Sequence, residues 1–359
     1  MGKRSTEQMD RVVGLDLGDR WASECVLSKD KGEVVRRGRV AMTRKALRRR
    51  YLSGERLRIV VEVGAQSPWV SRVLEALGHE VIVANAREVQ LIWGSGRKGD
   101  PTDAEALARL GRVDPALLRP IEHRSEATQC DLAVLRSRDA LVRSRTLLIN
   151  AARGISKALG HRLPSCSAEC FAQRMVEQIP QELSAALAPM LETIARLTEQ
   201  IRSYERWMGG RIEQVYPEAE CLQQVKGVGP VTSLAFVLTL ERPERFAKSR
   251  EVGPFLGLVP RRSQSGRSDP QLRITKRGDA YVRRLLVGSA QYILGPFGPD
   301  SDLRRYGLRI AERGGKNAKK RAVVAVARKL AVLLHHLWIT GEVYELLYQT
   351  DRAAVRAAA

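Results

Sequence analysis

The chain has few aromatic residues, few acids relative to its bases and few cysteines. Aromatic residues make up 5% of its 359 residues, and 40 Asp and Glu stand against 61 Lys and Arg. The formal net charge of +21 favours a polyanionic partner such as DNA or RNA over an acidic or uncharged one. A ribosomal protein, or a basic protein that binds no nucleic acid, would have a similar balance of charges.

The five cysteines are odd in number and scattered, which predicts free thiols in a reducing compartment rather than a disulfide framework. His161, Cys166 and Cys170 match no standard zinc spacing and lack a fourth ligand nearby, so a zinc site is not expected. The sequence begins with polar residues, and no stretch approaches the roughly 20 apolar residues of a membrane span. We therefore expect a cytoplasmic protein with no membrane partner.

Short runs that favour strands alternate with runs of helical spacing in the first third of the chain. Strands are expected over residues 12–17, 22–27, 33–40, 59–63 and 81–84. Helices are expected over residues 43–53 and 68–77, with a further helix from residue 100. The order of three strands, helix, strand, helix, strand, helix is that of an α/β RNase H-like domain, which we assign to residues 1–120.

Four acids of this domain lie where a magnesium nuclease of the RNase H type holds its ligands. Asp16 ends one apolar run, and Glu62 interrupts another. The segment Asp-Pro-Thr-Asp at 100–103 predicts a helix start with Asp100 as N-cap, which places Asp100 and Asp103 on one helix face. Neighbouring carboxylates are needed because a single one does not displace the hydration shell of Mg²⁺. The pattern predicts an enzyme that cuts nucleic acid.

The middle of the chain, residues 121–215, has a helical pattern in place of the alternating strands and helices of the first third. Apolar residues recur at steps of three and four in two long segments, 126–159 and 183–208. Such a repeat predicts an antiparallel helical hairpin or a coiled coil, which could also set dimerisation. Arginines along the first segment could additionally lie along a nucleic-acid backbone.

Residues 216–359 predict a mainly α-helical domain that contacts nucleic acid. The segment 226–229 has the form of a helix-hairpin-helix turn, whose glycines let backbone N–H groups approach a phosphate, although a simple tight turn is the alternative. A cationic cluster after two glycines opens a later helix, and an anion bound there would suit the helix dipole better than a solvated charged face. The candidate contacts are Lys226, Gly227, Gly229, Lys316, Lys319, Lys320 and Arg321.

A loop rich in glycine and serine lies between these two motifs, at residues 255–268. Arginines flank Ser265 on both sides, and guanidinium groups there would stabilise charge on phosphate oxygens. Spacing alone indicates a phosphate-binding or solvated loop and does not identify Ser265 as a nucleophile. The cations of this region that we assign to nucleic acid are Arg261, Arg262, Arg267, Lys276 and Arg277.

These motifs, taken together and in order, resemble the IS110 family of insertion-sequence transposases, also called DEDD recombinases. The resemblance covers nearly the whole chain, and one departure is Gly99, where the family commonly has threonine. It implies an N-terminal RuvC-like domain, a coiled-coil linker and a C-terminal transposase domain. It also implies that Asp16, Glu62, Asp100 and Asp103 bind Mg²⁺ and that Ser265 is the nucleophile that forms a phosphoserine link to DNA.

RNA-guided strand exchange is a further implication of the resemblance. A structured bridge RNA would pair with donor and target DNA, while the protein would recognise the shape and the backbone of the nucleic acids. Homodimers would pair into tetramers, with the acids of one protomer beside the serine of another, at the bacterial nucleoid.

Two other functions stay open. One is a Mg²⁺-dependent endonuclease of the Holliday-junction type, in which Ser265 only contacts phosphate, and the other is an RNA-binding chaperone with a decayed catalytic site.

Overall fold

The computed structural model describes residues 10–52, 54–86, 99–270 and 272–348. The chain divides into two compact units, Met1–Arg124 and Ser125–Ala359. The division into three domains that the sequence suggested, at 1–120, 121–215 and 216–359, stays a prediction.

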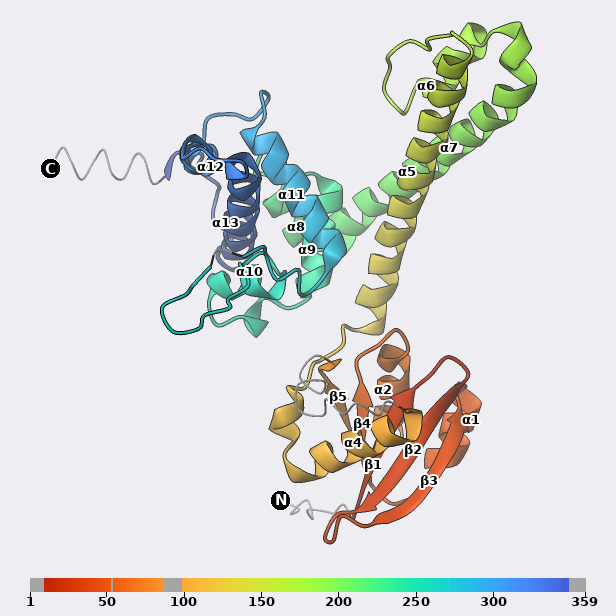
Figure 1. Ribbon diagram of the computed structural model, residues 1–359, viewed down its shortest axis with the longest axis vertical. Coiled ribbons are helices and arrows are strands. Elements are labelled where there is room, and N and C mark those ends of the chain that lie inside the picture. The colour runs from red at the N-terminus through yellow and green to blue at the C-terminus, as the bar shows by residue number, and fades with distance from the viewer. Residues whose placement is uncertain (1–9, 53, 87–98, 271, 349–359) are drawn as a thin grey trace, which may run out of the picture. The chain divides into compact units, whose positions relative to one another are not determined.

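The first unit is built on a mixed sheet with helices on both faces (Figure 1). The described strands are β1 (Arg11–Leu17), β2 (Trp21–Ser28), β3 (Val34–Ala41), β4 (Arg58–Glu62) and β5 (Glu80–Ala84). Their order across the sheet is β3-β2-β1-β4-β5, and β1 pairs antiparallel with β2 and parallel with β4. The helices are α1 (Arg44–Tyr51), α2 (Ser67–Ala76) and α4 (Asp100–Val113). Among these described elements, the order expected from the sequence is confirmed.

Side chains alternate along β1 and β4, and this alternation gives the two faces of the sheet to different helices. Every second residue joins a core cluster with α1 and α2. Val12 of β1 and Val60 of β4 point the other way, into a cluster with α4. Asp16 and Glu62 lie at even steps from these two valines, so both carboxylates project from the α4 face of the sheet.

Helix α4 touches β1 at Gly14. A Cβ there would stand 2.0 Å from the carbonyl oxygen of Ala104 and 2.6 Å from the nitrogen of Ala108, so a side chain cannot be accommodated. The C-terminal end of α4 lies at the amino ends of the strands, because Arg58 donates to the Gly111 carbonyl at 3.2 Å. The N-terminal turn of α4 therefore points toward the carboxyl ends of β1 and β4.

The start of α4 corrects one expectation. The helix begins at Asp100, and the N-cap is Gly99, with Pro101 at the second helical position. The N–H groups of Thr102 and Asp103 both bond to the Gly99 carbonyl. An N-cap residue has extended backbone, which Gly99 adopts with φ −172° and ψ 136°. The prediction of Asp100 as N-cap was wrong by one residue.

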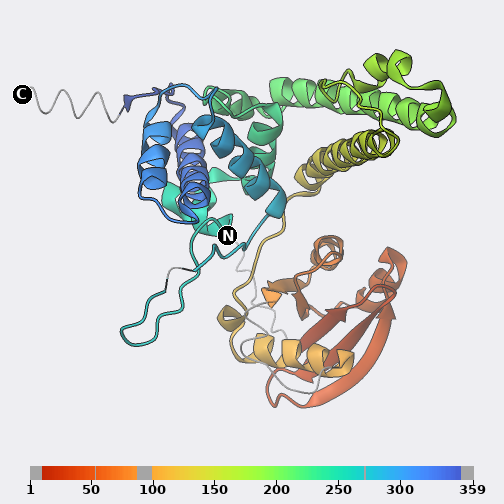
Figure 2. The same cartoon turned by 45° about the horizontal axis from the view of Figure 1, so that its top comes forward.

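The second unit is mainly helical, with its helices joined by loops and by one hairpin between α10 and α11 (Figures 1 and 2). Its helices are α5 (Glu126–Ala158), α6 (Phe171–Met175), α7 (Ser184–Gln214), α8 (Pro217–Leu222), α9 (Pro230–Leu240), α10 (Val252–Phe255), α11 (Ala280–Leu294), α12 (Asp302–Glu312) and α13 (Ala318–Thr340). Side chains of Ser125, Asp279 and Ser301 cap α5, α11 and α12 by accepting bonds from first-turn N–H groups. The mainly helical C-terminal region expected from the sequence is confirmed.

Helices α5 and α7 lie side by side as an antiparallel pair, because early residues of α5 contact late residues of α7. The contacting pairs are Asp131–Arg211, Arg138–Glu205 and Arg145–Thr198. The antiparallel helical hairpin is confirmed, while a coiled-coil supercoil stays a prediction. Arg145 is 5% exposed and also pairs with Glu169 at 3.1 Å, so it holds the hairpin rather than facing a nucleic-acid backbone.

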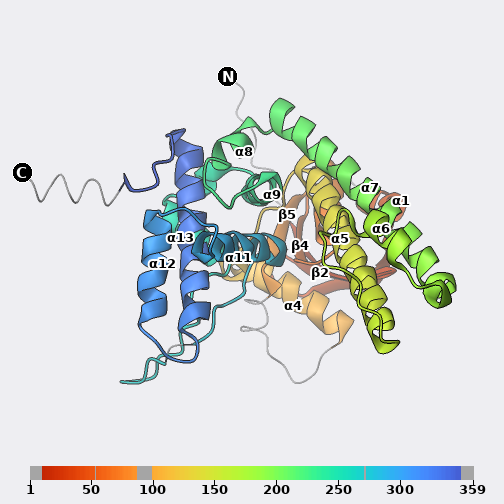
Figure 3. The ribbon, with the colours of Figure 1, turned by 90° about the horizontal axis from the view of Figure 1, so that it is seen from above.

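Helix α13 runs through the core of the second unit. Its buried residues, among them Val326, Leu330 and Leu334, join a cluster with α9 and α11, and α12 packs alongside (Figure 3). By length and composition α13 is long and apolar enough to cross a membrane, so the expectation that no stretch approaches this length was wrong. A helix packed by neighbours on several sides is apolar on several sides, which explains its composition.

Replacing Gly14 by alanine should loosen α4 from the sheet. The added methyl group would overlap two backbone atoms of the helix, and overpacking of this kind costs about 1–3 kcal/mol. Urea unfolding followed by circular dichroism would measure the loss. Gly64→Ala is the control, because no described atom lies within 4 Å of a Cβ at that position. Equal stability of the two variants would contradict the packing argument.

A buried carboxylate links β2 to β3 and α1. Glu24 is 3% exposed and accepts hydrogen bonds from Arg36 at 3.1 Å, Arg50 at 2.5 Å and the Tyr51 hydroxyl at 2.7 Å. Burial by itself would raise the pKa of Glu24. The hydrogen bonds from Arg50 and Tyr51 and the charges of both arginines outweigh burial, so the pKa lies below the ordinary value of 4.5.

This carboxylate should make the first unit sensitive to acid. Because folding lowers the pKa of Glu24, its stabilising contribution is complete above pH 4.5 and is lost as the pH falls through the folded-state pKa. Glu24→Gln should lose about 1–3 kcal/mol at neutral pH and should lose less than the wild type on acidification. Urea unfolding over a pH series would measure both effects, with the exposed Glu33→Gln as control. An equally steep loss in Glu24→Gln would rule out this role.

Candidate active site and nucleic-acid interface

Asp16 and Glu62 lie at the carboxyl ends of two neighbouring parallel strands. The ladder between β1 and β4 pairs Leu15 with Val61, one residue before each acid. Neighbouring strands are about 4.8 Å apart, so the two side chains start next to each other on the α4 face. Both acids are partly buried.

The acids of α4 lie in its first turn. Asp103 is partly buried and directly precedes Ala104, the residue that touches β1. Because this turn points toward the carboxyl ends of the strands, Asp103 lies on the same side as Asp16 and Glu62. Of Asp100 only the backbone is described, at the first helical position, and its side chain lies outside the described residues.

The donor atoms that meet at this edge are carboxylate oxygens, the ligand type that Mg²⁺ prefers. In the described part of the chain, which leaves out the Asp100 side chain, no three His, Cys, Asp or Glu side chains are arranged to hold a metal ion. Mg²⁺ commonly completes its shell with water and substrate phosphates rather than with an all-protein cage. The residues therefore fit Mg²⁺ by ligand type without forming a closed site.

A nearby acid of α4 has a structural role instead. Glu105 accepts hydrogen bonds from Arg37 at 2.6 Å and from Arg109 at 2.8 Å. These two bonds, that of Arg37 first, hold the pKa of Glu105 below its ordinary value. Glu105 ties α4 to β3 and is neutralised by its own neighbours.

An exposed hairpin between α10 and α11 extends from the second unit (Figure 2), and the pairing of Ser265 with Ser268 places Ser265 at its tip. Ser265 and Ser268 exchange two backbone hydrogen bonds of 3.0 Å, which closes a two-residue turn. Gly266 has a φ of +55° at the first turn position, where a type II′ turn has its glycine. Residues 261–270 are all exposed, so the serine at the tip is open to solvent.

Two glycines close the base of this hairpin. A Cβ at Gly257 would stand 2.1 Å from the Arg277 carbonyl, and one at Gly278 would stand 2.0 Å from the Phe255 carbonyl. Both glycines have positive φ, +69° and +74°. Arg283 of α11 donates to the Arg277 carbonyl at 2.8 Å, and burial lowers the pKa of this arginine. The base of the hairpin is thus fixed, while its tip extends into solvent.

The turn at 226–229 joins α8 to α9. Gly227 has a φ of +96°, and a Cβ there would stand 2.8 Å from the Tyr292 ring on α11, so packing alone requires this glycine. Lys226 and Gly229 are exposed, and Gly229 is the N-cap of α9. Of the three residues expected to contact nucleic acid, Lys226 and Gly229 are accessible and Gly227 has a packing role.

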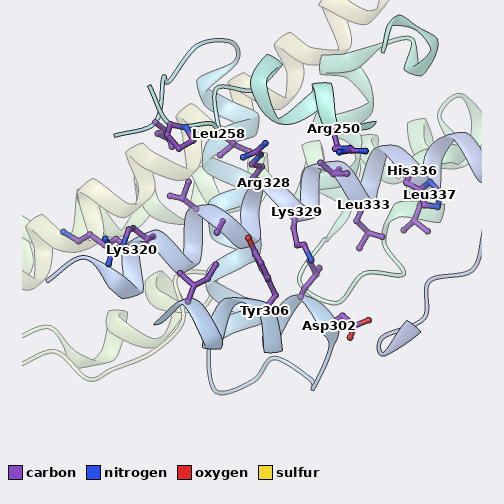
Figure 4. A pocket seen from close by; sticks show the side chains of 18 of the residues that line it. Arg250, Leu258, Asp302, Tyr306, Lys320, Arg328, Lys329, Leu333, His336 and Leu337 are labelled. Atoms are coloured by element: carbon purple, nitrogen blue, oxygen red, sulfur yellow. The ribbon is translucent and has the colours of Figure 1, made fainter. Parts of the chain in front are cut away.

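A groove of about 1750 Å³ runs from the base of the hairpin along α12 and α13 (Figure 4). Its lining combines cations with tyrosines, apolar side chains and the acids Asp302, Glu342 and Glu345. The cations outnumber the acids, and cations beside aromatic rings suit phosphates and unstacked bases. Lys329 of α13 stands over the ring of Tyr306 of α12, 4.2 Å from its centroid. The cations that line the groove are Arg250, Arg273, Lys276, Arg313, Lys320, Arg321, Arg328 and Lys329.

The groove contains some of the expected contacts and several that the sequence did not indicate. Lys276, Lys320 and Arg321 were expected, while Lys316 and Lys319 are exposed at the same helix start without lining the groove. The remaining cations come from separate segments that only folding brings together. One available signal was a pair of cations, at 328 and 329, inside a helix that is mostly apolar after residue 321.

Two sequence profiles match the chain. Residues 13–158 match a transposase profile of the DEDD type of IS110, and residues 219–303 match the transposase profile of the IS116/IS110/IS902 family. The first match contains the acid-bearing strands and α4. The second contains the turn at 226–229 and the Ser265 hairpin.

Known transposases are similar to much of the chain. The transposase for insertion sequence element IS1111A of Coxiella burnetii is 29% identical, over 95% of this chain and 93% of that protein. The probable family 20 transposase of Pseudomonas aeruginosa is 27% identical, over 77% and 82%. The transposase for insertion sequence element IS1328 of Yersinia enterocolitica is 30% identical, over 65% and 70%. The resemblance drawn from the motifs is confirmed: the chain belongs to the IS116/IS110/IS902 family of insertion-sequence transposases and is a DNA transposase.

Proposed function

We propose that this transposase exchanges DNA strands through a phosphoserine intermediate on Ser265, guided by a structured RNA. The observation that carries the proposal is the placement of Ser265 at the tip of an exposed hairpin with a fixed base. Such a hairpin can bring a hydroxyl to a DNA backbone, because the residues around its tip are exposed. The arginines on both sides of Ser265 suit the charge of the phosphate.

In the proposed step the Ser265 Oγ attacks the phosphorus of a DNA phosphodiester. The Oγ–P bond forms, the bond from phosphorus to the 3′ oxygen breaks, the serine proton passes to solvent, and the 3′ oxygen takes up a proton. A 3′-hydroxyl of the exchanged strand then reverses the step and releases the serine. The number of phosphate ester bonds is unchanged, so ATP is not required. Arg262 and Arg267 would stabilise the charge on the non-bridging oxygens.

The acids at the sheet edge would hold a divalent ion, which we propose to be Mg²⁺. When bound, such an ion polarises a phosphoryl oxygen and stabilises charge on the attacking and leaving oxygens. The proposed ligands are Asp16, Glu62, Asp100 and Asp103. Their placement on one face of the sheet, at the ends of β1 and β4 and in the first turn of α4, supports this assignment.

The groove and the exposed cations of the second unit would hold nucleic-acid backbone. Lysines and arginines that neutralise phosphates release counterions, which makes such binding strong and dependent on salt. A bridge RNA would then read the donor and target sequences by base pairing. We further propose that homodimers pair into tetramers, in which the acids of one protomer meet Ser265 of another, in the cytoplasm at the bacterial nucleoid.

Ser265→Ala should abolish covalent attachment to DNA. A suicide substrate that loses the strand needed for the reverse step should trap wild-type protein as an adduct on a denaturing gel. Loss of a covalent nucleophile should lower the yield by about a thousandfold or more. Ser263→Ala, in the same exposed hairpin, is the matched control and should retain the adduct. Mg²⁺-dependent cutting by Ser265→Ala would instead favour an endonuclease of the Holliday-junction type.

Asp16→Asn and Glu62→Gln should each lower strand cleavage by about a hundredfold or more, because each removes a proposed ligand charge. The RNA that co-purifies should be unaffected, and its sequencing should reveal one structured species. Glu75→Gln, an exposed acid of α2, is the control. Unchanged activity in both ligand variants, with RNA still bound, would favour an RNA-binding chaperone with a decayed site.

A further inference from the structure

The ladder that joins β1 to β4 stops just short of the two acids that these strands carry. Its last pair is Leu15 with Val61, and Asp16 and Glu62 are the next residues. Asp16 is still paired with Ser23 of β2, and Glu62 with Ala84 of β5, but no β1–β4 pair joins the two acids to each other. The distance between the two carboxylates therefore also depends on contacts that join the continuations of β1 and β4. A divalent ion makes this distance important, because Mg²⁺ requires near-ideal octahedral geometry with ligands at about 2.0–2.1 Å.

One side chain joins the two segments beyond the ladder. Nε2 of Gln66 donates to the carbonyl of Gly18 at 3.0 Å and to that of Asp19 at 3.1 Å. These carbonyls belong to the turn that follows Asp16, between β1 and β2. Gln66 itself follows Glu62 in the loop between β4 and α2, where it is the N-cap residue of α2. Gln66 thus connects the continuation of one acid-bearing strand to that of the other.

Gln66 is held in place by its own neighbours. Its Oε1 accepts a hydrogen bond from Trp69 Nε1 at 3.3 Å, which fixes the direction of the amide. The fully buried Ser67 closes the loop behind it, since its hydroxyl accepts from the Gly64 N–H at 3.0 Å and donates to the Gly64 carbonyl at 2.9 Å. Both amide protons of Gln66 are therefore directed at the β1–β2 turn by a loop of limited freedom.

We propose that Gln66 is a positioning residue that sets the spacing of Asp16 and Glu62 and thereby the affinity of the site for a divalent cation. The proposal rests on the proposed function, in which these acids hold the ion. Side chains that orient metal ligands without touching the metal typically change metal affinity by about 10–100-fold when they are removed. A role limited to folding would predict a loss of stability and no selective loss of metal binding.

Gln66→Met tests this role, because methionine keeps the length of the side chain and removes all three hydrogen bonds. Binding of Mn²⁺ to the full chain, measured by electron paramagnetic resonance of the free ion, should weaken about 10–100-fold while the unfolding midpoint changes little. The Mg²⁺ concentration for half-maximal cleavage should rise by the same factor, and the rate at saturating Mg²⁺ should approach that of the wild type. Gln66→Ala should behave in the same way.

Trp69→Phe is the matched control. It removes the hydrogen bond to Oε1 but leaves the two bonds that join the segments, so its Mn²⁺ affinity should stay close to that of the wild type. Wild-type affinity in Gln66→Met and Gln66→Ala would overturn the positioning role while leaving the proposed function intact. A loss of binding that follows a matching loss of stability in both variants would also overturn it. Absence of Mn²⁺ binding in the wild type would overturn the metal site and this role together.

Discussion

The close packing of α4 on β1 at Gly14 is the contact on which the arrangement of the acids depends. Without a side chain at that position, the backbone of α4 near Ala104 reaches the strand, and the bond from Arg58 to Gly111 fixes the other end of the helix. The position of Asp103 beside the strand ends follows from this packing. Interactions among the acids cannot place Asp103 there, because neighbouring carboxylates repel one another until a cation is bound.

The positively charged residues of the chain fall into two groups with different roles. Some arginines hold the fold by pairing with buried or partly buried acids, as Arg50 does with Glu24 and Arg211 does with Asp131. Others, such as Arg262 and Arg267 of the hairpin, are exposed and form no ion pair with any carboxylate of the described residues. Charges of the second kind repel one another in the free protein, so a polyanion that binds there relieves this repulsion.

The sequence predicts the first unit well because most of its strands are short apolar runs; β3, which contains Arg36, Arg37 and Arg39, is the exception. It misplaces the N-cap of α4 by one residue, since Asp and Gly both suit that position and backbone angles decide between them. The ordered set of motifs identifies Ser265 as the candidate nucleophile. The sequence of its loop alone does not distinguish a nucleophile from a residue that only contacts phosphate. Gln66 gives no sequence signal, because its partners lie 47 and 48 residues away and are backbone carbonyls.

The separation of serine and acids into two units is consistent with the chemistry proposed for them. The described hydrogen bonds of Ser265 are backbone bonds to Ser268, and among the described residues no His, Asp or Glu side chain is bonded to its hydroxyl. An exposed serine without a base is a weak nucleophile and needs activation from a group that is brought to it. In the function proposed above, that activation comes from the acids and the ion of another protomer, so the serine of a single protomer stays unreactive until the complex with DNA has assembled.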